Sequence, residues 1–462
     1  MIRFWLLCLN ILIVSSLYTQ EVYNKNIFGF ATSNTFTFFD TRADTFKEKI
    51  QKISPQVLRF PGGAVGNFYH FDKAEYGMKI SEIDSLITGK FPKRARGLIS
   101  YSKKKGHAYN YIDDFIALAK FSNSRAVLVA NVLTEKTEDI LNMIQKIKDS
   151  SIEIIGVELG SELSNKSYFD KGLLIDDYIK KSELISNAIK ISFPEILTAV
   201  VAAPLLENKN HRHYIWNKKL SHLSFYDAII VHSYAKVVKG KDQYGQMILE
   251  ENEGEKESSF LIYKKIVLDF FKDYYPKEIK NYNSIFDDTP IWITEWNLQY
   301  SKKTGNTLLQ GLFVANYFLE LISKDDYKSI ELTTFHNLAG RDFGGSIFQM
   351  KNNKTYIQST FYPIQLLSNI FSTEKLKVFS KKLTDDIFQY SFFMHKKLKK
   401  VIVINWNDEE FFIDKNSFNK KTEYYSKYLF DLNSDNEAII YKTSNIEGGR
   451  ILIKPYSLTL VE

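Results

Sequence analysis

The chain alternates short apolar runs, rich in β-branched residues, with longer segments in which apolar residues recur at helical spacing. Continuous apolar runs of this kind are typical of parallel strands buried on both faces. Eight strand–helix repeats over about 350 residues predict the α/β class and, within it, a (β/α)8 TIM barrel. A doubly wound open sheet is the alternative, but no run leads into a glycine-rich phosphate-binding motif. The predicted strands are 27–31, 57–60, 126–132, 154–159, 197–203, 228–231, 290–294 and 331–335, and predicted helices include 41–53, 111–121, 138–148, 176–191, 259–271 and 308–322.

The pattern changes after about residue 372. The remaining segments are short, rich in β-formers and separated by polar turns, which is typical of an all-β sandwich. The predicted organisation is therefore a signal peptide at 1–20, a catalytic barrel at 21–372 and a C-terminal β-sandwich domain at 373–462.

The N-terminal segment has the parts of a secretory signal peptide. Arg3 precedes a largely apolar run at 4–14, and small and polar residues follow. An uncleaved anchor and a plain buried helix are the alternatives. Cys8, the single cysteine, lies inside this run, so the chain forms no intramolecular disulfide and no cysteine-ligated metal site. We expect a secreted or periplasmic protein, with no membrane insertion after the signal is removed.

Composition sets few limits on function. With 44% hydrophobic and 25% charged residues over 462 positions, the chain is expected to be globular with a sizeable core. Its net charge of +7 is spread along the whole length, which indicates a compositional bias more than a groove for nucleic acid. We therefore expect no nucleic-acid partner, and the charge does not decide whether a substrate is acidic. Composition does not determine the oligomeric state.

Glutamates terminate two of the predicted strands. Glu158 and Glu162 lie at the end of the fourth strand, and Glu295 lies at the end of the seventh. In a barrel of this kind the active site forms at the carboxyl ends of the strands. One glutamate there is ordinarily a salt-bridge partner or a helix cap, but two on different strands provide the acid and the nucleophile that glycosidic cleavage requires.

Three motifs support this interpretation: LRFPGG at 58–63, ELGSE at 158–162 and WITEWN at 292–297. In this order they resemble the retaining glycoside hydrolases of clan A, particularly the α-L-arabinofuranosidase and heparanase-like β-glucuronidase families. PYSLTL at 455–460 resembles the closing strand of the β-sandwich in those families. The resemblance implies that Glu162 is the general acid/base, Glu295 the nucleophile and Glu158 structural. It also implies that Arg59 hydrogen-bonds the nucleophile, where a cation would lower the pKa of Glu295.

Side chains that follow the strands are candidates for binding the sugar. Tyr234 is expected to contact Glu295, Trp296 to stack on a sugar face, and His232 either to face the sugar or to be a hydrogen-bonded core histidine. Ser161 stands where the clan normally has an asparagine that contacts the sugar 2-hydroxyl. Either Asn131 takes over this contact, or the substrate differs there, or activity is impaired. The full set of candidates is Arg59, Asn67, Asn131, Ser161, His232, Tyr234, Trp296 and His336.

The sequence thus predicts a secreted retaining glycoside hydrolase that cleaves oligo- or polysaccharides by a two-glutamate double displacement, without cofactor or metal. A catalytically weak carbohydrate-binding protein on the same scaffold is the alternative. A metal-dependent hydrolase would need clusters of His and Asp at the strand ends, which the sequence does not contain. Sugar specificity and the choice between exo and endo action depend on the loops at 64–109 and 235–289, whose patterns predict neither.

Overall fold

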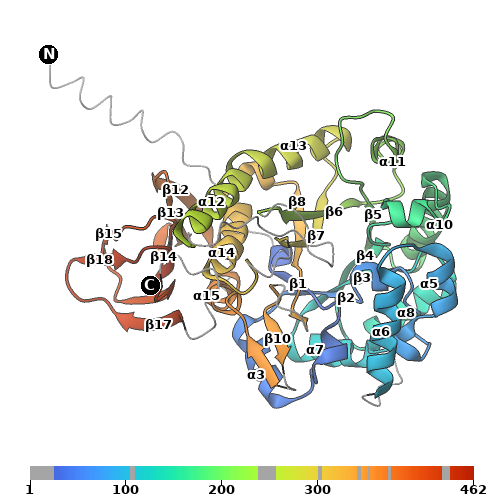
Figure 1. The fold of residues 1–462 in the computed structure, drawn as a ribbon, viewed down its shortest axis with the longest axis horizontal. Helices are drawn as coiled ribbons and strands as arrows, with labels where there is room; N and C mark the ends of the chain where they lie inside the picture. Colours follow the sequence, from blue (N-terminus) through green and yellow to red (C-terminus); the bar gives the residue numbers. More distant parts are fainter. Residues whose placement is uncertain are drawn as a thin grey trace.

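A computed structural model describes residues 25–104, 110–237, 256–299, 304–340, 345–351, 354–372, 376–428 and 438–462. The predicted signal peptide at 1–20 lies outside these residues. Among the helices in the described ranges, none combines the length and the apolar character needed to cross a bilayer. Figure 1 shows the barrel on the right of the view and the C-terminal strands, in red, on the left.

Eight parallel strands close into a barrel in chain order, which confirms the predicted fold class and excludes the open sheet. The strand β1 closes the barrel because it pairs with β2 on one side and with β8 on the other. The barrel strands are β1 (Gly29–Ala31), β2 (Val57–Phe60), β3 (Arg125–Val129), β4 (Ile154–Leu159), β5 (Leu197–Val201), β6 (Ala228–Ala235), β7 (Ile291–Leu298) and β8 (Ile330–Phe335).

Amphipathic helices cover the barrel because their apolar residues repeat at helical spacing. In α8 (Thr137–Asp149), for example, the buried residues Ile140, Met143, Ile144 and Ile147 form one face. The helix α14 (Leu308–Ser323) is buried along its whole length. The other covering helices are α3 (Asp44–Ile53), α7 (Ile112–Ser122), α10 (Ile175–Ser192), α11 (Arg212–Leu220), α12 (Lys256–Asp269), the π-helical η3 (Phe270–Tyr274), α13 (Tyr275–Ile285) and α15 (Phe361–Phe371).

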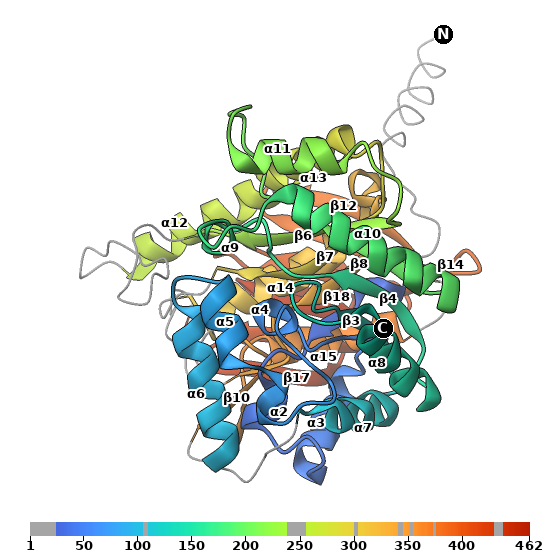
Figure 2. The ribbon, with the colours of Figure 1, turned by 90° about the vertical axis from the view of Figure 1, so that its right-hand side faces the viewer.

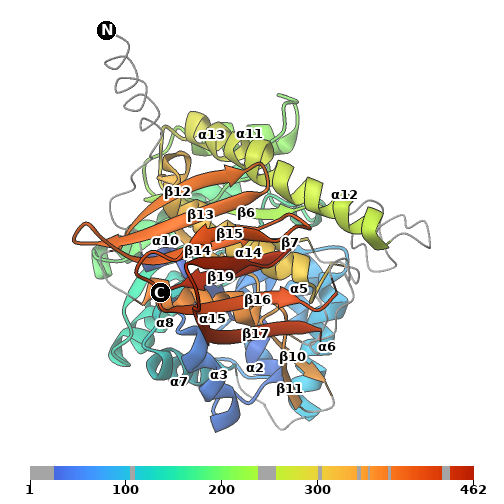
Figure 3. The same ribbon diagram turned by 90° about the vertical axis from the view of Figure 1, so that its left-hand side faces the viewer.

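Additional elements are inserted mainly after the barrel strands. In Figure 2 the inserted helices α5 and α6 lie toward one side of the barrel, and α7 and α8 lie toward the other. Figure 3, the opposite view, shows the same separation. The inserted and connecting elements are η1 (Lys25–Ile27), α2 (Thr35–Phe38), α4 (Gly63–Gly66), η2 (Glu75–Gly77), α5 (Ile80–Leu86), α6 (Phe91–Lys104), α9 (Lys166–Phe169), η4 (Asp325–Tyr327), β9 (Ala339–Gly340), β10 (Phe348–Lys351) and β11 (Lys354–Ile357).

The C-terminal domain is the predicted all-β sandwich. A six-stranded antiparallel sheet in the order β12-β13-β14-β19-β16-β17 is accompanied by the pair β15-β18, and Figure 3 shows this sheet face on. The apolar residues of the small core include Val403, Ile451 and Val461. The strands are β12 (Lys377–Thr384), β13 (Ile387–Met394), β14 (Lys397–Asn405), β15 (Phe411–Asp414), β16 (Lys420–Ser426), β17 (Ile439–Asn445), β18 (Arg450–Ile453) and β19 (Ser457–Val461).

The sandwich packs directly on the barrel helix α14. Tyr390 Oη donates a hydrogen bond of 2.9 Å to Glu320 Oε1, and both residues are buried. At Gly311 the two domains approach so closely that a Cβ atom would lie 2.0 Å from Tyr424 Oη. The absence of a side chain at Gly311 is therefore what allows this close packing.

We expect Gly311→Ala to lower the free energy of unfolding by about 1–3 kcal/mol, because the added methyl group must displace the buried Tyr424 ring. Gly97 is the matched control. It also lies inside a helix, α6, but a Cβ there would meet no atom within 4 Å. Gly97→Ala should raise stability by about 0.5–1 kcal/mol through helix propensity. Urea unfolding of the unmodified protein and the two variants measures both effects. Equal changes in stability for Gly311→Ala and Gly97→Ala would contradict the close approach of Tyr424 to Gly311.

Candidate active site

A buried guanidinium occupies the centre of the barrel mouth. Arg59 on β2 has no exposed surface, and its Nε and Nη2 donate to Glu158 at 2.6 and 2.8 Å. Its Nη1 donates to Glu295 Oε1 at 2.8 Å. Burial alone would lower the pKa of Arg59, but the charges of Glu158 and Glu295 outweigh burial and raise it. Arg59 is therefore a permanent cation that joins β2, β4 and β7.

Glu295 is held as a carboxylate by contacts to both of its oxygens. Arg59 binds Oε1, and Tyr234 Oη donates to Oε2 at 2.7 Å. Burial alone would raise the pKa of Glu295, but the charges of His232 and Arg59 and the Tyr234 hydrogen bond lower it well below the ordinary value. This ionised oxygen pair faces the mouth, and its bonded neighbours fix its direction.

Glu162 lies in a different environment, beyond the end of β4. Gly160 and Glu162 both have positive φ, 90° and 51°, so the chain turns sharply and returns the Glu162 side chain to the mouth. This side chain is 45% exposed, and Asn165 Nδ2 donates to Oε2 at 2.9 Å. The carboxyl group of Glu162 is therefore accessible, whereas that of Glu295 is enclosed.

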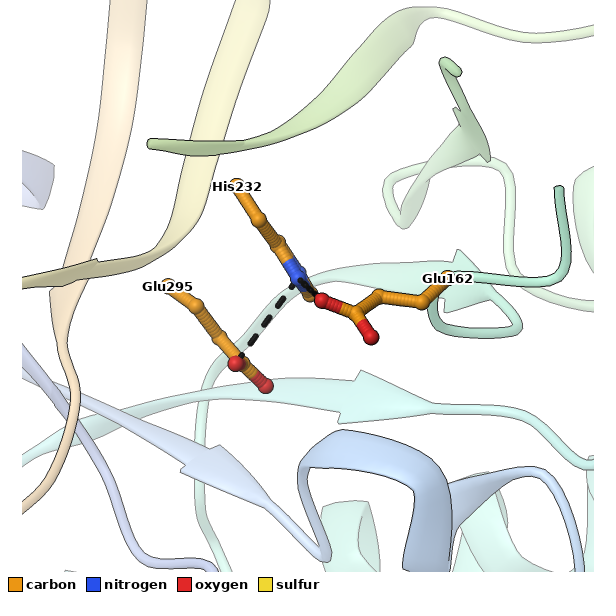
Figure 4. A group of neighbouring side chains, drawn as sticks. All are labelled: Glu162, His232 and Glu295. Carbon is orange, nitrogen blue, oxygen red and sulfur yellow. Dashed lines mark hydrogen bonds and ion pairs between the residues drawn. The ribbon is translucent and has the colours of Figure 1, made fainter. Parts of the chain in front are cut away.

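His232 bridges the two glutamates, as Figure 4 shows. Its Nδ1 lies 3.0 Å from Glu162 Oε1 and 3.7 Å from Glu295 Oε2. One carboxylate oxygen of each glutamate and one ring nitrogen of His232 all lie within 4.8 Å of one another. The two carboxyl groups thus face a common space at the mouth.

The protonation of His232 follows from its second contact. Thr294 Oγ1 donates its hydrogen to Glu158 Oε2 at 3.1 Å. His232 Nε2 lies 3.2 Å from Thr294 Oγ1. Because the hydroxyl hydrogen is already used, Nε2 must donate to Oγ1. The hydrogen bond between Nδ1 and Glu162 then contains one proton, carried by the ring or by the carboxyl group. Burial opposes a charged ring, but Glu295 and Glu162 raise the pKa of His232 overall. Thr294, which the sequence motif does not distinguish from a core residue, therefore orients the imidazole.

Asn67 and Ser161 lie beneath the mouth. Both amide atoms of Asn67 bond the backbone of Ser161, and Asn67 Nδ2 also donates to Tyr168 Oη at 2.7 Å. Ser161 Oγ lies 3.4 Å from Arg59 Nη2. Both side chains are fully buried, so they support the turn that carries Glu162 and present no surface to a sugar. The expectation that Asn67 and Ser161 contact the sugar is thereby corrected.

Asn131 closes the turn after β3. Its Oδ1 accepts from the backbone N–H groups of Leu133 and Thr134, and its Nδ2 donates to Thr134 Oγ1. Asn131 is buried and its amide is already engaged by this turn. In this structure the Asn131 side chain therefore stabilises the turn.

Trp296 corrects another expectation, because successive residues of a strand point to opposite faces. Glu295 points into the barrel, so Trp296 points outward, where its ring stacks on Tyr317 of α14 at 3.8 Å and is fully buried. Trp296 is core and does not stack on a sugar. His336, at the end of β8, lies edge-on to the Tyr234 ring at 6.1 Å, and burial lowers its pKa.

Glu162, His232 and Glu295 are also the group among the described residues whose donor atoms could hold a metal ion. The Arg59 guanidinium, however, is bonded directly to Glu295. A second cation at this carboxylate would be repelled at short range. The arrangement is therefore better suited to carboxylate chemistry than to metal binding.

A second polar network supports the loops after β2 and β3. His70 is buried, with Nε2 2.7 Å from Glu82 Oε2 and Nδ1 in contact with Glu135. Thr134, the residue bonded by Asn131, donates to Glu82 Oε2 at 2.8 Å. Burial opposes a charged His70, but its hydrogen bonds to Glu135 and Glu82 raise its pKa. No local motif indicates this network, because its members come from three separate segments.

No family model matches the sequence, and no curated protein matches it. Solved structures match the fold over nearly the whole chain. A GH51 arabinofuranosidase from Xanthomonas axonopodis pv. citri is 9% identical, with a TM-score of 0.65 over 97% of this chain and 98% of that one. A family 51 α-L-arabinofuranosidase from Bifidobacterium longum is 10% identical, with a TM-score of 0.64 over 96% of each chain. A 4-O-α-L-rhamnosyl-β-D-glucuronidase from Fusarium oxysporum 12S is 11% identical, with a TM-score of 0.58 over 97% of each chain. The resemblance to clan A glycoside hydrolases is thus confirmed in the fold.

We expect the contribution of His70 to stability to depend on pH. The folded-state pKa is raised above the ordinary value of 6.5, so this contribution is complete below about pH 6.5 and is lost as pH rises through the folded-state pKa. His70→Gln should cost about 2 kcal/mol at pH 6 and clearly less at pH 9, as measured by urea unfolding. His222→Gln, at an exposed position, is the control and should change stability little at either pH. An equal loss at both pH values for His70→Gln would contradict a charged His70.

Proposed function

We propose that the protein is a retaining glycoside hydrolase in which Glu295 is the nucleophile and Glu162 the general acid/base. The observation that carries the proposal is the different environment of two carboxyl groups that share one space. Glu295 is buried and bonded to Arg59 and Tyr234, and its pKa is lowered. Glu162 is half-exposed and shares a proton with His232. Two carboxyl groups with such contrasting surroundings are suited to opposite roles in one reaction.

In the first step, a Glu295 oxygen attacks the anomeric carbon of the sugar. The bond to the leaving oxygen breaks, and that oxygen takes the proton of Glu162. Arg59 and Tyr234 hold the carboxylate in place during the attack, and they remain bonded to the resulting glycosyl ester. His232 can transfer a proton to Glu162, since its Nδ1 lies 3.0 Å from Glu162 Oε1.

In the second step, Glu162 is a carboxylate and removes a proton from water. The water oxygen attacks the anomeric carbon, the ester bond breaks, and its electrons return to Glu295. Two inversions give overall retention. The separation of 4.8 Å or less between one oxygen of each glutamate supports this course, because inverting enzymes hold their carboxyl groups about 6.5–9.5 Å apart.

We expect Glu295→Gln to reduce hydrolysis of a chromogenic glycoside by about 10⁴-fold or more, because the amide cannot form the glycosyl ester. A screen of aryl glycosides identifies the substrate, and NMR of the first product gives its stereochemistry. Glu153→Gln is the control. This exposed glutamate precedes β4 and pairs with Arg125 at the start of β3, so the variant should retain full activity. For Glu162→Ala, added azide should restore turnover and give a glycosyl azide of retained configuration.

Several outcomes would reject the proposal. Inversion of configuration would exclude a glycosyl ester on Glu295. Undiminished activity of Glu295→Gln would exclude this residue as the nucleophile. If the unmodified protein and Glu295→Gln bind a sugar equally well but neither hydrolyses it, the chain is a carbohydrate-binding protein on a glycosidase scaffold.

We also propose that residues 1–20 direct export of the chain and are removed, on the strength of the Arg3 and apolar-run pattern. Expressed from its own Met1 in a bacterial host, the protein should appear outside the cytoplasm with a mass that corresponds to a start near residue 21. A variant lacking residues 2–20 should remain in the cytoplasm. Recovery of the intact chain, Met1 included, in the cytoplasm would contradict this proposal.

A further inference from the structure

The insertion that follows β5 reaches the turn that carries Glu162. His213 on α11 is buried, and its Nε2 lies 3.2 Å from the carbonyl oxygen of Ser164, two residues after Glu162. Arg212 Nε donates to the same oxygen at 3.3 Å. Because a carbonyl oxygen only accepts, His213 Nε2 must carry a hydrogen. These two side chains, which we call the α11 donors, therefore hold one peptide group of the turn.

The surroundings of His213 keep its ring neutral. Burial and the charge of Arg212 lower the pKa of His213 to about 4. A neutral ring with its hydrogen on Nε2 has a bare Nδ1, and this buried atom has no hydrogen-bond partner among the described residues. Within that part of the chain, the Ser164 carbonyl is therefore the polar group to which the ring is directed.

The position of α11 is fixed by contacts with the ends of two barrel strands. Trp216 Nε1 donates to the carbonyl oxygen of Val201, the last residue of β5, at 2.8 Å. The Trp216 ring also stacks on Tyr178 at 4.9 Å. Tyr178 Oη in turn donates to the carbonyl oxygen of Leu159, the last residue of β4, at 2.8 Å. The α11 donors are therefore held by the strand after which Glu162 follows.

The held peptide group is bonded to Glu162 on its other side. A peptide group is planar, so fixing the carbonyl oxygen of Ser164 also fixes the N–H of Asn165. This N–H donates to the carbonyl oxygen of Glu162 at 3.0 Å. Asn165 Nδ2 donates to Glu162 Oε2 at 2.9 Å. The α11 donors therefore act on Glu162 through Asn165, at both the backbone and the carboxyl group.

Glu162 has a backbone conformation that its neighbours must maintain. Its φ of 51° lies in the left-handed region, which a residue with a Cβ adopts at a cost in energy. Such strain persists where the surrounding contacts over-determine the backbone. Asn67 holds the chain before Glu162, and the α11 donors hold it two residues after Glu162. Without these donors, the turn can relax and carry the carboxyl group away from His232, toward which it points in Figure 4.

We propose that His213 and Arg212 are positioning residues for the general acid/base, which keep the Glu162 carboxyl group at the mouth by holding the Ser164 carbonyl. This inference rests on the proposed function and deepens it. A displacement of about 1 Å in a catalytic group can cost about 100-fold in rate. The insertion after β5 thus acts on proton transfer, although neither positioning residue touches the sugar or the reacting atoms.

The test uses the leaving group to separate proton donation from the rest of the reaction. Phenol leaves slowly unless its oxygen is protonated, whereas 2,4-dinitrophenol leaves as an anion. His213→Leu and Arg212→Met remove the donors and retain bulk. In the double variant, kcat/KM for a phenyl glycoside should fall by about 10–100-fold. For the 2,4-dinitrophenyl glycoside of the same sugar, kcat/KM should change by less than about threefold.

Two further measurements distinguish positioning from a general loss of structure. His213→Gln and Arg212→Gln each place an amide N–H near the position of the lost donor, and they should restore most of the activity toward the phenyl glycoside. Azide is already an anion and needs no general base. It should therefore raise kcat of the double variant for the 2,4-dinitrophenyl glycoside, because hydrolysis of the glycosyl ester also requires a well-placed Glu162. The unmodified protein should show no such increase.

Asn217→Ala is the matched control. Asn217 lies on the same helix and is buried, and its amide bonds the backbone N–H and carbonyl oxygen of Ala203 at 2.7 and 2.9 Å. The variant should be less stable, but its ratio of kcat/KM for the two glycosides should equal that of the unmodified protein. Equal losses for the two glycosides in the double variant, or no loss for either, would overturn the inference.

Glu162→Ala tests the proposed function separately. It should lose more activity toward the phenyl glycoside than the double variant does. If Glu162→Ala discriminates between the leaving groups and the double variant does not, this inference fails while the proposed function stands. If Glu162→Ala does not discriminate either, the proposed function fails and this inference fails with it.

A crystal structure of the double variant gives a result that needs no substrate. The φ of Glu162 should leave the left-handed region, and Glu162 Oε1 should lie beyond hydrogen-bond distance of His232 Nδ1, from which it is 3.0 Å in the unmodified protein. Glu162 in an unchanged position would overturn the inference. Arg212 is half-buried, so Arg212→Met alone should fold if the double variant does not, and the same measurements then apply to it.

Discussion

The site depends on one constraint, the burial of the Arg59 charge inside the barrel. A guanidinium without access to water is tolerated only where carboxylates surround it and every donor is engaged. Glu158 accepts two hydrogen bonds from Arg59. Thr294 Oγ1 donates a further hydrogen bond to Glu158. A further donor, Nη1, bonds Glu295. A stabilising arrangement thereby fixes the oxygen that the proposed reaction uses, and Glu158 acts as a structural counter-ion.

The two candidate catalytic carboxyl groups differ in exposure because one lies within β7 and the other lies beyond the end of β4. Glu295 still belongs to its strand and is enclosed by its neighbours. Glu162 lies beyond β4, on a turn with two residues of positive φ that Asn67 clamps through the backbone of Ser161. His232 lies between them and contacts both. The enclosed group is thus held ionised by fixed charges, whereas the accessible one is hydrogen-bonded to the His232 ring.

The C-terminal sandwich and the insertion after β2 pack against different parts of the barrel. The sandwich covers α14, whose many apolar residues would otherwise leave a large hydrophobic surface in water. The insertion after β2 instead packs its helix α6 against η2 and α2. Solved glycoside hydrolases with 9–11% identity retain this overall arrangement, so the fold is compatible with very different side chains.

The sequence by itself determined the periodic features and the local motifs. Runs of buried apolar residues indicate parallel strands whatever their neighbours are, and Glu158, Glu162 and Glu295 are recognisable because each ends such a run. Only the tertiary structure decided which way Trp296 points, that the amides of Asn67 and Asn131 are engaged by backbone, and that His70 meets two glutamates from distant segments. The physical reason is that hydrophobic period is a property of consecutive residues. The partner of a polar side chain is set by which segments the closed barrel brings together.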